Sequence, residues 1–479
     1  MANGSSVVGI GLQYGDEGKI KAFDRVAASA KVWVRFNGGP NAGHNLKVGD
    51  VHLITHGVPS GFIRDGVLGY IGSGTVINPE KMNAEIAYIA AHRFNLNNRL
   101  FISANASLIQ PSHILLDRIS GDEVGTTGNG IGPAYADQAL RQLGSLLKNI
   151  RVGDYLANPD ANQMQVQMNL EDVMNRYADL MQKKKVSDIN LSALVNTFDK
   201  QTRRLAPYLC DNPFFVEEYI QQGHDIFFEG ANAVGLDVIL GTVPYVTASR
   251  TIAAAAYTGG DLPVKYHTKT IGVAKAIASR VGNGPFIGEF GKEESEKYCM
   301  EKNELGESGK RYVKEVEAQL YEPSLLLKSD NPLEIGIALR MLGNEYGATT
   351  KRPRRIGMLD LVMLKQNCRL NGVDELYLNK VDCLRDFANS SLPGIPLVTG
   401  YELDGQKINY VPATETQLHR VKPIIDYFPA FREDISSVRQ KEDLPKAVHE
   451  FIRFVEDQVQ TPLLGIGVGP EREEYVALR

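Results

Sequence analysis

The chain has 479 residues and a formal net charge of −5, with 43% hydrophobic and 23% charged residues. This composition is typical of a globular protein, and its acidic balance argues against a nucleic-acid-binding surface, which would be basic. No apolar run is as long as a membrane-spanning helix, which needs about 18 residues, so we expect no membrane partner. The four cysteines lack the C-x-x-C spacing of a zinc site, and we expect them to be reduced thiols. We therefore expect a cytoplasmic protein without a signal peptide.

Apolar runs of strand length alternate with helical patterns along the chain. Continuous apolar strands separated by helices are typical of a mostly parallel sheet that is covered on both faces. We therefore predict the α/β fold class, with a large, mostly parallel central sheet, helices on both faces and an inserted helical subdomain. The predicted strands are Val7–Ile10, Val32–Phe36, Leu68–Ile71, Leu100–Ile102, Asp225–Phe228, Ile271–Ile277, Glu375–Leu378 and Leu463–Val468. The predicted helices include Pro79–His92, Leu170–Lys184 and Leu444–Val459.

We expect one domain over residues 1–479, with a helical insertion at residues 291–342. The insertion is predicted because the segment from Lys292 to Glu317 is charged and helix-prone, and turns with proline and aspartate follow it. A pair of solvated surface helices is the simpler interpretation of this segment, and we favour it.

The first predicted strand ends in a glycine-rich loop, Gly11-Leu-Gln-Tyr-Gly-Asp-Glu-Gly-Lys19. Backbone N–H groups in such a loop point at phosphate, and a lysine neutralises its charge. Asp16 and Glu17 would repel phosphate unless a metal or a proton transfer needs a carboxylate, so the loop predicts chemistry at a phosphate. It is not a standard P-loop, because Gln13 and Ile20 replace the first glycine and the hydroxyl residue of that motif. A glycine-rich turn without a ligand is the alternative.

Four further loops carry polar groups at or after predicted strands. Phe36-Asn-Gly-Gly-Pro-Asn-Ala-Gly-His-Asn45 places His44 among backbone donors, which makes this histidine a candidate acid or oxyanion partner, although single histidines are more often structural. Gly125-Thr-Thr-Gly-Asn-Gly-Ile-Gly-Pro133 suits a second phosphate, or is a mobile surface loop. Phe228-Glu-Gly-Ala-Asn-Ala233 and Pro244-Tyr-Val-Thr-Ala-Ser-Arg-Thr251 lie at strand ends, where ligands collect in open α/β sheets.

Two motifs in the second half of the chain predict ligand classes. Gly347-Ala-Thr-Thr-Lys-Arg-Pro-Arg-Arg355 concentrates cations beside two threonines, and arginine forks bind carboxylates bidentately. A dicarboxylate or phosphate ligand is the sharper interpretation, and a solvated basic loop or an RNA contact is the simpler one. Asn379-Lys-Val-Asp382 predicts guanine, because its carboxylate can accept from N1–H and the 2-amino group, a pair of donors that adenine lacks.

Taken in order, these segments resemble the motifs of the adenylosuccinate synthetase family. The family pattern includes Gln-Trp-Gly-Asp-Glu-Gly-Lys, Asn-Ala-Gly-His-Thr, Gly-Thr-Thr-Gly-x-Gly-Ile-Gly-Pro, Phe-Glu-Gly-Ala-Gln, Pro-Tyr-Val-Thr, Arg-Val-Gly-x-Gly-Pro-Phe and Gly-Ala-Thr-Thr-Gly-Arg-x-Arg. The last two correspond here to Arg280–Phe286 and Gly347–Arg354. The resemblance covers essentially the whole chain.

The resemblance implies a homodimeric ligase that joins L-aspartate to C6 of a purine nucleotide, with a nucleoside triphosphate and Mg²⁺. Asp16 would take the N1 proton of a 6-oxopurine, whose O6 then attacks the γ-phosphate. His44 would donate to O6, Lys19 would offset phosphate charge, and the aspartate amine would displace the phosphate. The implied site residues are Asp16, Lys19 and His44 for catalysis; Gly15, Gly18, Lys19, Asn45, Lys380 and Asp382 for the triphosphate; Asn41, Thr127, Asn232, Thr247 and, from a second subunit, Arg141 for the purine nucleotide; Thr349, Thr350, Arg352 and Arg354 for aspartate; and Asp16 with the Gly43 carbonyl for the metal.

The chain departs from the family pattern mainly around the two nucleotides. Asn45 replaces threonine, Asn232 replaces glutamine and Ile20 replaces glycine, while Ala248-Ser-Arg-Thr251 replaces Ser-Ser-Asn-Thr. The aspartate loop also carries Lys351 and Pro353. The acceptor and the phosphoryl donor could therefore differ from the usual IMP and GTP.

Three alternatives to the IMP and GTP reaction follow from these departures. A phage-type enzyme would use dGMP with ATP, dATP or GTP in the host cytoplasm, to make N6-succino-2-amino-2′-deoxyadenylate for 2-aminoadenine DNA. Against it, Asp16 is retained here, whereas such phage enzymes replace the catalytic aspartate. Asp16 does not by itself exclude guanine, because a carboxylate can accept from N1–H and the adjacent 2-amino group together. The others are a GTP-binding regulatory protein and a homologue that has lost catalysis. Retention of Asp16, Lys19 and His44 together argues against both, and IMP with GTP is our first expectation.

Overall fold

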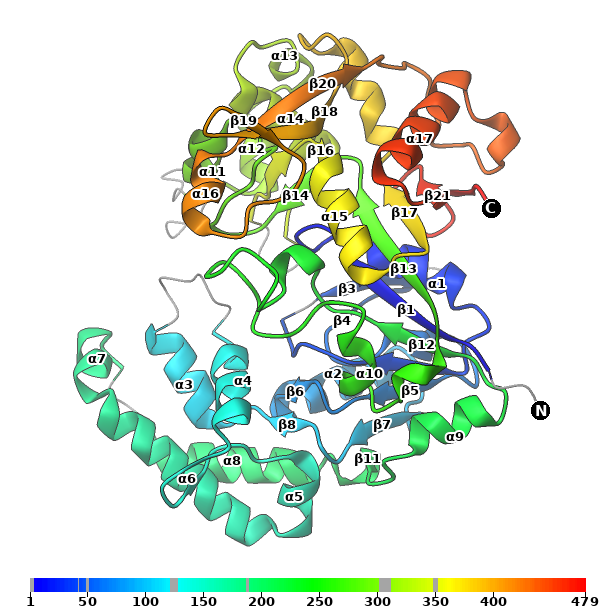
Figure 1. The fold of residues 1–479 in the computed structure, drawn as a ribbon. Coiled ribbons are helices and arrows are strands. Elements are labelled where there is room, and N and C mark those ends of the chain that lie inside the picture. The colour runs from blue at the N-terminus through cyan, green and yellow to red at the C-terminus, as the bar shows by residue number, and fades with distance from the viewer. Residues whose placement is uncertain are drawn as a thin grey trace. The chain divides into compact units, whose positions relative to one another are not determined.

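The computed structural model in Figure 1 describes residues 4–41, 43–48, 51–120, 128–186, 189–300, 312–347 and 352–479. Of the predicted site residues, Thr127, Thr349 and Thr350 lie outside these ranges, and so does the side chain of Asn45. The chain divides into two compact units. The first comprises residues 1–9, 23–231 and 247–269, and the second comprises residues 10–22, 232–246 and 270–479.

The predicted mixed α/β fold with a large, mostly parallel sheet is confirmed. In the first unit the strands run in the order β11-β7-β5-β2-β12-β1, and each neighbouring pair is parallel. Arg35 and Glu229 are register partners at the ends of β2 and β12, so the loops after these strands leave from one edge. The strands are β1 Ser6–Gly11, β2 Val32–Arg35, β3 His44–Val48, β4 Val51–Thr55, β5 Leu68–Ile71, β6 Val76–Ile77, β7 Leu100–Ser103, β8 Ser107–Leu108, β9 Gln142–Leu143, β10 Leu146–Leu147, β11 Leu209–Cys210 and β12 Ile226–Glu229.

Helices of the first unit confirm one predicted helix and correct another. Helix α2 begins where predicted, because the Asn78 side chain accepts from the backbone N–H of Lys81 and Pro79 takes the first position. The prediction of one helix over Leu170–Lys184 is wrong, since α6 ends at Arg176 and α7 follows it. The helices are α2 Pro79–Ala91, α3 Pro111–Ser120, α4 Ile131–Leu140, α5 Val152–Ala157, α6 Pro159–Arg176, α7 Ala178–Lys183, α8 Leu191–Arg203, α9 Phe215–Gln221 and α10 Ala255–Gly259.

The second unit continues the parallel pattern. Strands β13, β17 and β21 are parallel and β22 is antiparallel, so all eight predicted strands are present. Lys275 and Asn379 are register partners at the ends of β13 and β17. Helix α1 (Lys19–Val26) begins directly after the glycine-rich loop. The strands are β13 His267–Lys275, β14 Ala278–Arg280, β15 Arg355–Gly357, β16 Leu359–Asp360, β17 Glu375–Asn379, β18 Ile395–Leu403, β19 Gln406–Ile408, β20 Lys422–Phe428, β21 Leu463–Gly467 and β22 Tyr475–Ala477.

The helices of the second unit include those of residues 291–342, the segment that we predicted to be an insertion. Residues 291–342 form four helices in their described part, and Tyr298, Cys299 and Ile337 make a small buried cluster among them. Helix α17 also confirms the predicted helix that ends at Val459. The helices are α11 Lys292–Met300, α12 Lys314–Leu320, α13 Pro323–Leu326, α14 Pro332–Leu342, α15 Leu361–Asn371, α16 Glu415–Arg420 and α17 Lys446–Val459.

Two observations bear on the environment of the protein. All four cysteines are buried and unpaired. Within the part of the chain that the structure describes, no helix has both the length and the apolar character that crossing a membrane requires.

Candidate active site

The two carboxylates of the glycine-rich loop have different surroundings. Glu17 is fully buried and accepts from the backbone N–H groups of Gln13 and Gly15, at 3.2 and 2.8 Å, and from Lys19 Nζ at 3.1 Å. Its neighbour Asp16 keeps a side chain that is 42% exposed. Glu17 therefore shapes the loop from within, whereas Asp16 is the carboxylate that can reach a ligand.

The backbone of this loop has the conformation of an anion cradle. Gly15, Asp16 and Gly18 have φ angles of +87°, +57° and +73°, and a left-handed conformation of this kind turns successive N–H groups to one side. For Asp16 it is unusual, because non-glycine residues adopt it rarely and often at functional sites. Asn379 Nδ2 donates to the Glu17 carbonyl oxygen at 2.6 Å and ties the loop to the end of β17.

Asp16 is bound by an arginine of the predicted aspartate loop. Arg354 Nη2 lies 2.9 Å from Asp16 Oδ2, and Arg354 Nη1 donates to Glu345 Oε2 at 2.6 Å. Glu345 also accepts from Lys275 Nζ at 3.1 Å, and Lys380 Nζ lies 3.6 Å from its other oxygen. Thus a cluster around the buried Glu345 brings together the predicted base, a predicted aspartate-binding arginine and the lysine of the guanine motif, which are far apart in the sequence.

Charge within this cluster is strongly coupled. Burial works to raise the pKa of Glu345, but the adjacent Lys275, Arg354 and Lys380 outweigh it and hold that pKa far below its usual range. Burial lowers the pKa of Lys275, and the Glu345 carboxylate opposes this shift. Neither Glu345 nor Lys275 is among the residues that the sequence predicted for the site. Their only sequence signal is position, since Lys275 ends a predicted strand and Glu345 stands two residues before the Gly347 motif.

His44 belongs to a second buried cluster, which lies within the first unit. His44 Nδ1 is 2.6 Å from Glu229 Oε1, and Arg35 Nη1 is 3.1 Å from the same oxygen. The other oxygen, Oε2, accepts from the backbone N–H of Ser60 at 2.8 Å and from the Ser60 hydroxyl. A carboxylate on Nδ1 fixes the orientation of the ring, and Arg35 Nη1 lies 3.3 Å from Nε2. The sequence placed Glu229 in a motif without giving it this role.

The Glu229 carboxylate is ionised in this cluster. Burial works to raise its pKa, but His44, Arg35 and Ser60 together hold the pKa at about 2. Burial lowers the pKa of Arg35, and the Glu229 charge opposes that shift. Glu229 is therefore a permanent anion at neutral pH.

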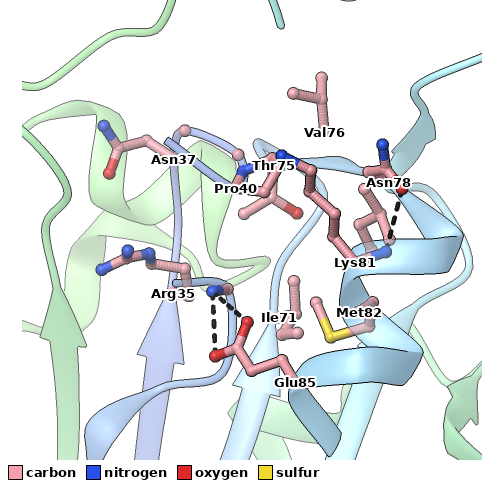
Figure 2. Close-up of a pocket in the computed structure, with 14 residues that line it drawn as sticks. Arg35, Asn37, Pro40, Ile71, Thr75, Val76, Asn78, Lys81, Met82 and Glu85 are labelled. Carbon is pink, nitrogen blue, oxygen red and sulfur yellow. Dashed lines mark hydrogen bonds between the residues drawn. The ribbon is translucent and has the colours of Figure 1, made fainter. Parts of the chain in front are cut away.

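Figure 2 shows a pocket beside this cluster, lined by Arg35, Asn37, Thr75, Lys81 and Glu85 among others. Its cavity volume of about 20 Å³ is room for little more than one water molecule. Glu85 accepts from the backbone N–H groups of His56, Gly57 and Val58, at 2.8, 2.9 and 3.1 Å. The pocket is therefore too small for a nucleotide, and Glu85 instead anchors the segment that follows β4.

Several predicted ligand-binding residues hold buried polar atoms with no hydrogen-bond partner among the described residues. These atoms are Asn41 Oδ1, Asn232 Oδ1, Arg354 Nε and Asp382 Oδ1. Burial raises the pKa of Asp382, because the carboxylate lacks enough compensating donors. Unsatisfied buried groups are rare and costly in native proteins. Buried atoms of this kind also occur elsewhere, as at Ser112 Oγ and Asn169 Oδ1, but at the predicted nucleotide-binding and aspartate-binding residues they are available to a polar ligand.

The other predicted residues are placed as follows. Lys380 has a φ of +64° and donates to the Gly343 carbonyl oxygen. Arg141 is exposed at the C-terminal end of α4, with a φ of +64°. Gly43 and Arg352 are exposed, and Thr247 is half-buried.

Comparisons with known proteins identify the family of the chain. The family model described as adenylosuccinate synthetase matches residues 7–476. A relative from Cupriavidus pinatubonensis named adenylosuccinate synthetase 2 is 40% identical over 465 residues, which cover 97% of this chain and 95% of the relative. The fully ligated adenylosuccinate synthetase from Plasmodium falciparum superposes with a TM-score of 0.78 at 29% identity, over 99% of this chain and 100% of that one.

A more distant likeness concerns the fold alone. Succinoaminodeoxyadenylate synthetase from cyanophage S-2L, a structure with bound dGMP and dATP, matches 99% of this chain and 95% of its own with a TM-score of 0.55, but at 16% identity.

Proposed function

Since this chain belongs to the adenylosuccinate synthetase family, whose members are C–N ligases, we propose that it joins L-aspartate to C6 of IMP. GTP supplies the driving force, and the products are adenylosuccinate, GDP and phosphate. The observation that carries the proposal is the contact of 2.9 Å between Asp16 and Arg354. This contact supports the proposal because Asp16, the proposed base for the purine, lies beside a cation suited to the carboxylates of aspartate.

The proposed reaction has two steps. First, Asp16 removes the N1 proton of IMP, and the resulting O6 anion attacks the γ-phosphorus of GTP and releases GDP. His44 donates toward O6, with its ring oriented by Glu229, and Lys19 offsets charge on the phosphate. Second, the amine of aspartate attacks C6, the bond from C6 to the phosphorylated oxygen breaks, and inorganic phosphate leaves. The amine loses a proton in this step.

The residues of the chain fit a magnesium ion, which the family implies. Mg²⁺ prefers hard oxygen ligands and usually keeps waters and substrate phosphates with only one or two protein oxygens. The partly exposed Asp16 carboxylate and the carbonyl of the exposed Gly43 are donors of this kind. The described residues contain no group of three or more metal-ligating side chains, and a phosphate-bridging ion needs none. When bound, the ion would neutralise charge on the transferred phosphate.

We propose that Arg352 and Arg354, with Thr349 and Thr350, bind the aspartate substrate. Arg354 is already oriented by Glu345, so its guanidinium is presented in one direction. A fixed arginine fork matches a carboxylate in geometry as well as in charge. Asn41, Asn232 and Thr247, with Thr127, are the proposed ligands of the purine nucleotide, and Gly15, Gly18, Asn45 and Lys380 those of GTP.

A substrate panel tests the proposed function directly. The purified protein is incubated with aspartate, Mg²⁺ and each pairing of IMP, dIMP, GMP or dGMP with GTP, ATP or dATP, and products are identified by mass spectrometry. We expect the adenylosuccinate mass with IMP and GTP. A succinylated product from dGMP but not from IMP would replace this proposal with the phage-type reaction, and no product from any pairing would contradict ligase activity. The relative named adenylosuccinate synthetase 2, at 40% identity, supports neither the dGMP alternative nor the regulatory one.

The first prediction concerns which nucleoside triphosphate, GTP or ATP, serves as the phosphoryl donor. Asp382 Oδ1 is buried without a partner among the described residues, and guanine supplies the two N–H donors that a carboxylate accepts. Leaving it unpaired with adenine costs about 1–3 kcal/mol, so GTP should exceed ATP in kcat/KM by roughly tenfold or more. Asp382→Ala should remove most of that preference. Asp386→Ala, on the same short helical segment, is the matched control and should retain it.

Equal use of ATP and GTP by the unaltered protein would contradict the role of Asp382. The Asn379–Asp382 motif would then be an inherited feature without a present function, and the departures at the nucleotide sites would gain weight.

The second prediction concerns assembly. The family supplies one arginine across a two-fold axis, and the residues near Arg141 in the sequence include the exposed apolar Leu140, Leu143 and Leu147, at 42%, 37% and 36% exposure. Exposed apolar side chains around a functional cation suit a subunit interface. We therefore propose a homodimer in which Arg141 completes the site of its neighbour.

The buried, unpaired cysteines also suit a cytoplasmic location.

Subunit mixing tests this assembly. Arg141→Leu and Asp16→Asn proteins should each be nearly inactive, and a mixture should regain up to about a quarter of wild-type activity, because random exchange makes half of the dimers hybrid and each hybrid has one intact site. Either variant mixed with itself is the control. Demonstrated subunit exchange without recovery would mean that Arg141 acts in its own subunit.

A further inference from the structure

A second buried carboxylate of the second unit has no part in the reaction described above. Glu317, on helix α12, is fully buried and accepts four hydrogen bonds. The donors are Tyr298 Oη at 2.9 Å, Arg340 Nε at 3.1 Å, Arg340 Nη2 at 2.5 Å and Tyr346 Oη at 2.5 Å. Both carboxylate oxygens are thus fully engaged, so the carboxylate holds its donors in fixed directions.

Two of these donors lead to the ends of the predicted aspartate loop. Tyr346 directly precedes Gly347, the first residue of the loop motif. Arg340, which α14 carries, uses its third nitrogen, Nη1, to donate to the Arg354 carbonyl oxygen at 3.1 Å. Glu317 therefore holds the residue before the loop through the Tyr346 side chain, and Arg340 holds the end of the loop through the Arg354 carbonyl oxygen.

Backbone hydrogen bonds join the two ends of the loop at its base. The Gly347 N–H donates to the Arg352 carbonyl oxygen at 2.9 Å, and the Arg354 N–H donates to the Glu345 carbonyl oxygen at 3.1 Å. The Arg354 guanidinium leaves from this base toward Asp16 and Glu345. A shift of Tyr346 or of the Arg354 carbonyl would therefore move the cation proposed to bind aspartate.

Stability alone is a weak reason for a buried ion pair at this position. The cost of removing two charges from water largely offsets their attraction, and well-packed apolar residues are often as stabilising. Buried polar networks do, however, impose one geometry on the groups that they join. Here the joined groups are the two ends of a loop and the helices α12 and α14 of the segment that the sequence predicts to be an insertion.

We propose that Glu317 and Arg340 are positioning residues for aspartate, and that α12 and α14 serve to hold the two described ends of the aspartate loop, at Tyr346 and Arg354, in place. This corrects our sequence-based preference for a solvated surface helix pair, because Glu317 and Arg340 are both buried. The inference rests on the proposed function, since that function assigns aspartate to this loop.

Tyr346→Phe is the most conservative test, because it removes one hydroxyl and leaves the ring. Loss of a hydrogen bond to a charged group should raise KM for aspartate at least roughly threefold, and Glu317→Gln should raise it roughly tenfold or more, with KM for IMP and GTP unchanged. Tyr401→Phe is the matched control for the first variant, since Tyr401 donates to the buried Asp360 carboxylate at 2.5 Å without contact to the loop. Glu315→Gln, exposed on α12, is the control for the second.

A purely structural role would lower the melting temperature of Tyr346→Phe and Tyr401→Phe alike and leave the KM for aspartate unchanged, which would overturn the proposal. Equal increases in all three KM values would overturn it as well. Hydrogen exchange at the Gly347 and Arg354 amides supplies a readout besides activity, and Glu317→Gln should accelerate it relative to Glu315→Gln. If that acceleration occurs but the wild type forms no product with any substrate, the proposed function fails while the anchoring of the loop stands; unchanged exchange overturns the anchoring.

Discussion

Asp16→Asn is expected to lower kcat by roughly 10²–10⁴-fold, the contribution of a positioned general base. Asparagine has nearly the same shape and tolerates the left-handed backbone, with a φ of +57° at this residue, so the loop should keep its conformation. What is lost is the ability to take the N1 proton and to present a charged oxygen to Mg²⁺. The measurement is steady-state turnover with IMP, GTP and aspartate at saturation.

The chain offers a close control for this substitution. Asp404 also has a left-handed backbone, with a φ of +53°, and pairs with an arginine, Arg420, at 3.3 Å. Asp404→Asn should leave turnover unchanged, because this pair lies on the exposed side of a strand connection. Unchanged turnover in Asp16→Asn would remove Asp16 from its proposed role, provided that thermal unfolding shows the variant to be folded.

Glu229→Gln should lower kcat by roughly 10–100-fold, because the carboxylate that orients His44, the proposed donor to O6, is lost. It should also cost about 3–5 kcal/mol of unfolding free energy, since Arg35 would be left buried beside a neutral amide. Glu85→Gln is the control, because Glu85 is a buried carboxylate of the same unit that accepts from backbone N–H groups and not from His44. Its variant should lose stability but keep kcat, and an equal loss of kcat in both variants would contradict the role of Glu229.

The stability difference between wild type and Glu229→Gln should depend on pH in a defined direction. The pKa of Glu229 is lowered from 4.5 to about 2 in the folded protein, so the carboxylate contributes stability that is fully present above pH 4.5. This contribution is lost as the pH falls from 4.5 toward 2. Urea unfolding at pH 7 and at successively lower pH should therefore show the two proteins converging below pH 4.5. A constant difference across that range would mean that Glu229 is not ionised in the native protein.

Local patterns in the sequence were sufficient for the fold class, and they also predicted the chemistry of individual loops. Buried parallel strands must be apolar on both faces, so runs such as Leu68–Ile71 were recognisable without partners. Ligands collect at polar loops that follow such strands, which made Asp16, His44 and Asp382 candidate site residues. The first half of α6 was missed, because its polar, glutamine-rich sequence has no clear apolar stripe, and only Asn158 and Pro159 mark its start.

The partners of these residues were decided by the tertiary structure alone. His44 and Glu229 are 185 residues apart in the sequence, and the contacting residues Asp16 and Arg354 are more than 330 residues apart. No rule of sequence spacing connects either pair. The adjacent carboxylates of Glu17 and Asp16 also lie in different environments, because Glu17 is buried and accepts hydrogen bonds, whereas Asp16 is partly exposed. A sequence specifies which groups are available, but burial and charge coupling act between groups that only the folded chain brings within a few ångströms. Those two effects set which carboxylate orients a neighbour and which one is available to react.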